Sequence, residues 1–143
     1  MKVFKSKFGY EIMFFITVIF VPILGLIIYL GEPMSEILFV LAVFLAVYTF
    51  FLYLNWTTTY TITDGGVLKV KCGGLFNQLI DIQKIKSVSK TRNLISSPAP
   101  SLDRIQLTYS KYDIIIISPE DKNDFAKELL KVNPKIENRL NRQ

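Results

Sequence analysis

Two long apolar runs constrain the fold of this chain more than any other feature. Residues 12–30 and 37–54 contain no charged side chain, and only a six-residue segment with the acids Glu32 and Glu36 separates them. At 1.5 Å rise per residue, a helix of about 20 residues spans the roughly 30 Å hydrocarbon core of a bilayer. Helices that are apolar on every face need a membrane or a large protein around them, and the 89 residues that follow are too few to supply the latter. We therefore predict an N-terminal transmembrane hairpin, residues 1–55.

The charges that flank the two spans predict their orientation. Lys2, Lys5 and Lys7 precede the first span, the turn is acidic, and Lys69 and Lys71 are the first basic residues after the second span. Because basic flanks are retained in the cytoplasm, we expect a multi-pass membrane protein with both termini cytoplasmic. A signal peptide also begins with basic residues, but this run is too long, lacks a small-x-small cleavage site and precedes a second span. Aromatic residues expected at the inner interface are Phe8, Tyr10, Tyr53 and Trp56.

Residue types that the chain lacks exclude several kinds of chemistry. There is no histidine, which excludes Ser-His and His-metal centres, and Cys72 is the only cysteine, which excludes an intrachain disulfide. No phosphate-binding loop or nucleophile motif is present, and neither span carries an ionisable residue of the kind that marks ion pathways. We therefore expect no catalytic residue, no metal and no cofactor, which argues against an enzyme or a transporter subunit.

After the second span the hydrophobic pattern becomes alternating, which is typical of β-strands. Glycines at 65–66 and 73–74 predict tight turns, and Cys72 shares the apolar face of its strand, where we interpret it as a core residue. Ile85 and Val88 are three residues apart, so a bulge is expected in the fourth strand. The predicted strands are residues 56–63, 67–72, 75–82, 85–92, 103–109 and 112–117.

One amphipathic helix is predicted near the C-terminus. Ser118 is the expected N-cap and Pro119 the first helical residue, and Asn133 and Pro134 end the helix. The polar tail, residues 135–143, is expected to fray. The apolar stripe of the helix contains Phe125, Ala126, Leu129, Leu130 and Val132.

The element order, about six short strands and then one helix, is that of a pleckstrin-homology-type barrel. Residues 96–105 (Ser-Ser-Pro-Ala-Pro-Ser-Leu-Asp-Arg-Ile), 109–113 and 117–122 resemble the YyaB-like bacterial pleckstrin-homology domain, and the resemblance covers roughly residues 57–134. It implies an α+β chain in which a cytoplasmic antiparallel β-barrel, residues 56–134, is closed by the C-terminal helix. Members of this family are small membrane proteins without established catalytic residues, and some resemble lantibiotic-immunity proteins. The residues that carry the motif are Ser97, Pro98, Ser101, Asp103, Arg104, Ser118 and Pro119.

Two groups of residues are candidates for a site. The serine and proline residues of the motif favour a structural role in fixing a loop, while Arg104 is able either to pair with an acid or to hold a ligand phosphate. The second group lies within nine residues that contain no acid, and it fits either a solvated strand face or a surface for anionic lipid. This group consists of Lys84, Lys86, Lys90 and Arg92.

Two functions follow as hypotheses. The first is a membrane-anchored binding module at the cytoplasmic membrane face, whose partners are the lipid bilayer and another membrane protein and for which the resemblance implies bacteriocin immunity. The alternative is an anionic-lipid-binding module tethered by the hairpin. Fourteen basic and nine acidic residues after the second span make the domain only mildly basic, which suits a membrane surface better than nucleic acid.

Overall fold

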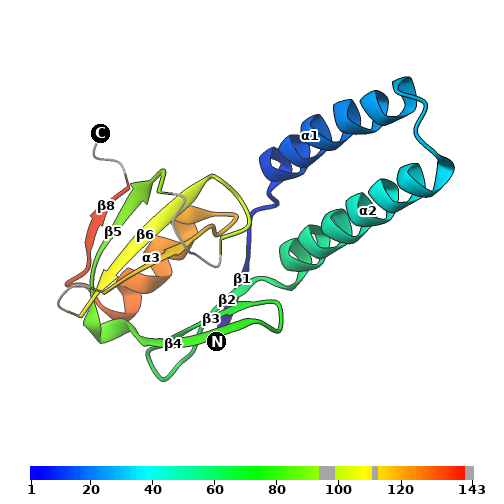
Figure 1. The fold of residues 1–143 in the computed structure, drawn as a ribbon. Coiled ribbons are helices and arrows are strands. Elements are labelled where there is room, and N and C mark those ends of the chain that lie inside the picture. Colours follow the sequence, from blue (N-terminus) through cyan, green and yellow to red (C-terminus); the bar gives the residue numbers. More distant parts are fainter. Residues whose placement is uncertain (94–98, 111–112, 141–143) are drawn as a thin grey trace.

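The computed structural model describes residues 1–93, 99–110 and 113–140. Two antiparallel helices, α1 (Tyr10–Tyr29) and α2 (Met34–Thr57), project from one side of a compact domain (Figure 1). Both helices are long and apolar enough to cross a membrane, and almost none of either is buried within the protein. The rings of Phe20 and Phe44 pack at 5.2 Å between the two helices.

The first sheet has the strand order β1-β2-β3-β4, and all its pairs are antiparallel. Its strands are β1 (Lys2–Lys5), β2 (Thr59–Ile62), β3 (Val67–Cys72) and β4 (Phe76–Asp81). β1 was not predicted from the sequence. Because β1 precedes the hairpin and pairs with β2, which follows it, the two helices are an insertion between adjacent strands of one sheet (Figure 1).

The second sheet has the strand order β7-β6-β5-β8. It contains β5 (Ile85–Thr91), β6 (Arg104–Tyr109), β7 (Asp113–Ile117) and β8 (Glu137–Arg139). The register of β5 against β6 shifts between Ile85 and Ser87, which confirms the predicted bulge. β8 pairs with β5 in parallel, so the sheet is mixed.

The expectation of a closed antiparallel barrel is wrong. A 3-10 turn, η1 (Ile82–Lys84), separates β4 from β5, so these consecutive strands lie in different sheets. On the other side, where β1 and β7 end, the described residues join the sheets by a single isolated bridge between Ser6 and Pro119. The domain is therefore a pair of sheets with α3 (Lys122–Val132) packed against their shared core.

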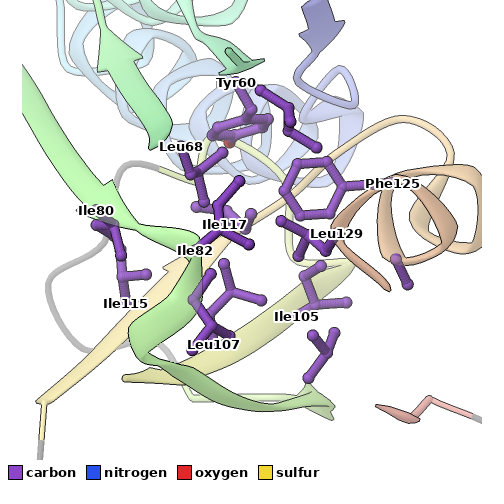
Figure 2. Packing of buried hydrophobic residues seen from close by; sticks show 14 of the residues in the cluster. Tyr60, Leu68, Ile80, Ile82, Ile105, Leu107, Ile115, Ile117, Phe125 and Leu129 are labelled. Carbon is purple, nitrogen blue, oxygen red and sulfur yellow. The ribbon is translucent and has the colours of Figure 1, made fainter. Parts of the chain in front are cut away.

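The core confirms the predicted apolar stripe of α3, and the C-cap Asn133 confirms the predicted end of the helix, but the helix starts later than predicted. Phe125, Ala126 and Leu129 are buried, and Figure 2 shows the ring of Phe125 among side chains from both sheets. The N-cap is Asp121, not Ser118: its carboxylate accepts a hydrogen bond from the backbone N–H of Asp124 at 2.8 Å.

The C-terminal tail does not fray over the described residues. It forms β8, and Ile136 and Leu140 on either side of this strand are 4% and 2% exposed. The burial of these two apolar residues was not predicted, because polar neighbours separate them and they form no hydrophobic pattern in the sequence. Burial of both against the core offsets the polarity of the segment.

Candidate functional site at the base of the hairpin

Both ends of the hairpin are fastened to the domain by hydrogen bonds. The Lys7 backbone N–H donates to the Ser118 carbonyl at 2.7 Å, immediately before α1. The Gly9 N–H donates at 2.7 Å to Oδ1 of Asn55, which is 6% exposed and lies in the last turn of α2. The two helices therefore leave the domain side by side, from positions that the fold fixes.

A buried hydroxyl cluster lies directly beneath this base. The Ser6 and Ser118 hydroxyls are 2.9 Å apart, and the Tyr60 hydroxyl accepts a hydrogen bond from the Ser118 backbone N–H at 3.1 Å. Burial raises the pKa of the Tyr60 phenol despite its hydrogen bonds to Ser118 and Ser6, so the group stays neutral and able to donate. The cluster ties β1 and β2 to the end of β7, where Ser118 precedes α3.

The motif loop packs against the start of the hairpin. A Cβ placed on Gly9 would lie 2.1 Å from the Pro100 carbonyl oxygen, so only glycine fits between α1 and this loop. The neighbouring Ala99 and Ser101 are buried as well. The loop thus continues the surface from which the helices emerge.

Arg104 holds the loop through its backbone. The side chain is 7% exposed, and its guanidinium donates to the carbonyls of Ser101 at 2.7 Å, Ala99 at 3.0 Å and Asn93 at 3.2 Å. A planar guanidinium with several fixed donors suits such convergent carbonyls, whereas a lysine is a single point charge. Through these contacts the Arg104 side chain fixes the motif loop.

We predict that Arg104→Lys destabilises the domain by about 2–3 kcal/mol, because at least one buried carbonyl loses a charge-assisted hydrogen bond. Pulse proteolysis in urea of the full chain in nanodiscs measures this change. Arg92→Lys makes the same change at an exposed position and is expected to stay within about 0.5 kcal/mol. Equal stability of the two variants would contradict the structural role of Arg104.

Asp103 bridges two lysines from different parts of the chain. Its carboxylate accepts a hydrogen bond from Lys7 Nζ at 2.9 Å and another from Lys122 Nζ. Partial burial alone raises the pKa of the Asp103 carboxyl, but the bonds from Lys122 and Lys7 outweigh burial and lower the pKa below its ordinary value. This bridge links the residue before the hairpin to the start of α3.

A groove of about 1000 Å³ opens next to this bridge, between the end of β5, the motif loop and the start of α3. Its walls carry both signs of charge. Lys90 and Arg92 lie on one wall, and Glu120 and Asp121 lie on the other. Among the described residues, neither Lys90 nor Arg92 forms an ion pair. The lining residues are Lys90, Thr91, Arg92, Leu102, Asp103, Arg104, Glu120, Asp121, Lys122, Asn123 and Leu140.

The structure divides the four basic residues that the sequence grouped. Lys90 and Arg92 line the groove, whereas Lys84, in η1, and Lys86, at the bulge of β5, are exposed and do not line it. The bulge changes the direction in which the side chains point along β5. The sequence predicted the bulge, but it did not determine which residues of β5 pair with which residues of β6.

The residues of the sequence motif also fall into two groups, some at the groove and some buried beside it. Asp103 and Arg104 lie at the groove, and Ser101, Ser118 and Pro119 are buried beside it. Ser97 and Pro98 lie outside the described residues. Sequence reasoning missed Gly9 and Asn55, since it assigned them to a membrane hairpin; the polar Asn55 just inside an apolar helix end was the available signal.

Two sheets and one C-terminal helix around a single core, with a groove where the helix begins, define the class of this domain as a pleckstrin-homology-like module. A family model described as "Bacterial PH domain" (bPH_4) matches residues 58–133. The chain belongs to this family of bacterial PH domains. The match begins at the residue before β2, so it does not include β1. Neither the curated proteins nor the solved structures compared with the chain gave a match.

Proposed function

We propose that this protein is a membrane-anchored PH module that binds a protein partner in the groove, at the cytoplasmic face of the membrane. The observation that carries the proposal is the position of the groove. Its wall contains Asp103, which is hydrogen-bonded to Lys7 three residues before α1 begins. A partner in the groove would therefore lie directly beneath the hairpin.

The anchoring part of the proposal is supported by the two helices. Their large side chains are exposed over the whole length, including Phe15, Leu26, Phe39 and Leu45 at 56–66%. Such a surface is unfavourable in water and suits a bilayer. The cytoplasmic orientation is proposed from the lysines before α1 and the acids in the turn.

The charges of the groove favour a protein partner over lipid. A site for an anionic headgroup gathers cations, whereas Glu120, Asp121 and Asp103 share this groove with Lys90, Arg92 and Lys122. A polypeptide with both signs of charge is complementary to such walls, and complementarity of this kind gives specificity more than affinity. A binding role rather than catalysis agrees with the lack of histidine in the sequence.

Site-specific photo-crosslinking in the native membrane tests the proposal. A photoreactive phenylalanine at position 92 or 123, on opposite walls of the groove, is expected to give the same protein adduct. Position 113 is the matched control, because Asp113 is exposed at the far end of β7. The double variant Lys90→Glu/Arg92→Glu should remove the adduct formed from position 123. Adducts that form equally from position 113, or fail to form from both walls, would contradict partner binding in the groove.

Bacteriocin immunity remains a hypothesis that the resemblance implies, and neither the matched family nor the groove adds an observation specific to it. The six residues between the two apolar runs are too few to bind a peptide outside the cell, so protection would act in the bilayer or through the domain. Growth of a sensitive bacterium that expresses the chain, measured against membrane-active bacteriocins, tests the hypothesis. No protection against any of them would remove it.

A further inference from the structure

An apolar turn lies beside the hairpin base, on the opposite sheet from the groove. β3 and β4 pair up to Cys72 and Phe76, and the turn between these residues consists of Gly73, Gly74 and Leu75. Leu75 is 75% exposed, although tight turns are usually polar where they meet water. The following Phe76 is also partly exposed, at 37%.

This turn packs against the last two turns of α2. Gly73 has a φ of +58°, and a Cβ on it would lie 3.1 Å from Tyr53 Cε1 and 3.3 Å from Leu54 Cδ2. Leu54 is the last residue of the second apolar run, and tyrosine favours the membrane–water interface. The turn therefore lies at the depth where α2 leaves the membrane, and Leu75 extends from that turn.

Lysines flank the turn on the outer face of the first sheet. In the ladder row nearest the hairpin, Lys5 pairs with Thr59, and Thr59 pairs with Lys71. All three side chains point away from the core, because Phe4, Tyr60 and Val70, which form the adjacent row, are buried. The next row of the same face adds Lys69, and these two rows contain no acid: Val3, Lys5, Thr59, Thr61, Lys69, Lys71, Asn77 and Leu79.

We propose that the β3–β4 turn is a second membrane contact of the domain, in which Leu75 enters the inner-leaflet interface and Lys5 and Lys71 bind anionic lipid headgroups. Basic residues near such a surface are attracted to anionic headgroups, and an exposed leucine gains by leaving water. The inference rests on the proposed anchoring by the hairpin and adds a specific lipid-facing surface to it. Anionic lipid is thereby assigned to the first sheet, away from the groove.

Quenching of indole fluorescence by brominated lipids tests this contact, since Trp56 is the only tryptophan of the chain. Three full-length proteins are compared in nanodiscs that contain phosphatidylglycerol and dibrominated phosphatidylcholine. The first is the natural chain, the second is Trp56→Phe/Leu75→Trp, and the third is Trp56→Phe/Asp64→Trp. Asp64 is exposed in the turn between β2 and β3, at the opposite end of the sheet.

The indole at position 75 is expected to be quenched at least half as strongly as Trp56, and at least three-fold more than the indole at position 64. Strong quenching of Trp56 with equal, weak quenching at positions 75 and 64 would overturn this inference and leave the anchoring intact. Unquenched Trp56 would overturn the anchoring and the inference together. If the indole at position 75 disturbs the turn, Leu75→Cys/Cys72→Ala labelled with an environment-sensitive fluorophore gives the same comparison.

The lysines are tested in the same nanodiscs. Lys5→Gln/Lys71→Gln is expected to lower the quenching at position 75 at least two-fold. Lys84→Gln/Lys86→Gln removes the same charge from η1 and β5 and is expected to leave the quenching unchanged. Equal losses in the two double variants would overturn the assignment of headgroup binding to Lys5 and Lys71.

Discussion

A fragment that begins at residue 57 is expected not to fold, although the matched family region begins at residue 58. Such a fragment lacks β1, which pairs with the whole of β2 from Lys2 opposite Ile62 to Lys5 opposite Thr59. It also lacks Phe4, which is 7% exposed and packs against Phe125 with ring centroids 5.1 Å apart. Loss of the phenylalanine alone is worth about 3–5 kcal/mol, which approaches the full stability of a small domain.

Removal of β1 destabilises the domain further, beyond the loss of the Phe4 ring. β2 would become an edge strand with unpaired backbone groups. The Ser6 hydroxyl would no longer be present to contact Ser118, which is fully buried. A buried polar group left without its partner costs about 1–3 kcal/mol.

The matched control keeps β1 and removes the helices instead. Because Gly9 and Asn55 are hydrogen-bonded at 2.7 Å, a short glycine-serine linker in place of residues 10–54 can join the two ends. We expect this linked chain to be soluble, with slow amide hydrogen exchange in β2 and β6, whereas the fragment 57–143 exchanges rapidly throughout. A fragment 57–143 with the same protection as the linked chain would show that β1 is dispensable.

Periodicity was sufficient to predict the elements whose side chains alternate between core and solvent. β3 and β6 were expected from their alternation, and their inward residues Leu68, Val70, Ile105 and Leu107 are all fully buried. The two apolar helices and the stripe of α3 were predictable for the same reason. In each case, one short stretch of sequence contains the whole signal.

β1 was not predictable in this way, because it has only four residues, two of them lysines, and these give no pattern of their own. Its assignment depends on β2, which is more than fifty residues later, and the lysines around it were interpreted as topology signals of the first span. The closed barrel was wrong for a related reason: whether β4 and β5 pair across η1 depends on tertiary packing and not on the pattern of either strand.

The candidate site was even less accessible to sequence reasoning. The four basic residues at 84–92 lie close together in the chain, but the bulge after Ile85 separates them into two pairs on the surface. Conversely, Lys5 and Lys71 are far apart in the chain and become neighbours of Thr59 only through the pairing of three strands. The Asp103 bridge likewise joins residues from three segments. Contacts of this kind follow from strand register, which alternation alone does not fix.

Phe125→Ala is expected to destabilise the domain by about 3–5 kcal/mol, because the cavity that it leaves is surrounded by elements that cannot all move inward. The side chain is fully buried, and its ring lies 5.1 Å from that of Phe4 and 6.3 Å from that of Tyr60. The residue thus packs α3 against β1 and β2 of the first sheet, as Figure 2 shows for Tyr60.

Pulse proteolysis in urea of the full chain in nanodiscs measures the loss, since it reports the unfolded fraction of the domain while the helices stay in lipid. Leu79→Ala is the control, because it truncates a large apolar side chain that is 67% exposed and is expected to cost less than about 1 kcal/mol. If the two variants unfolded at the same urea concentration, α3 would not be part of the core. The groove beside its first turn would then have no fixed wall, and the proposed partner site would fail with it.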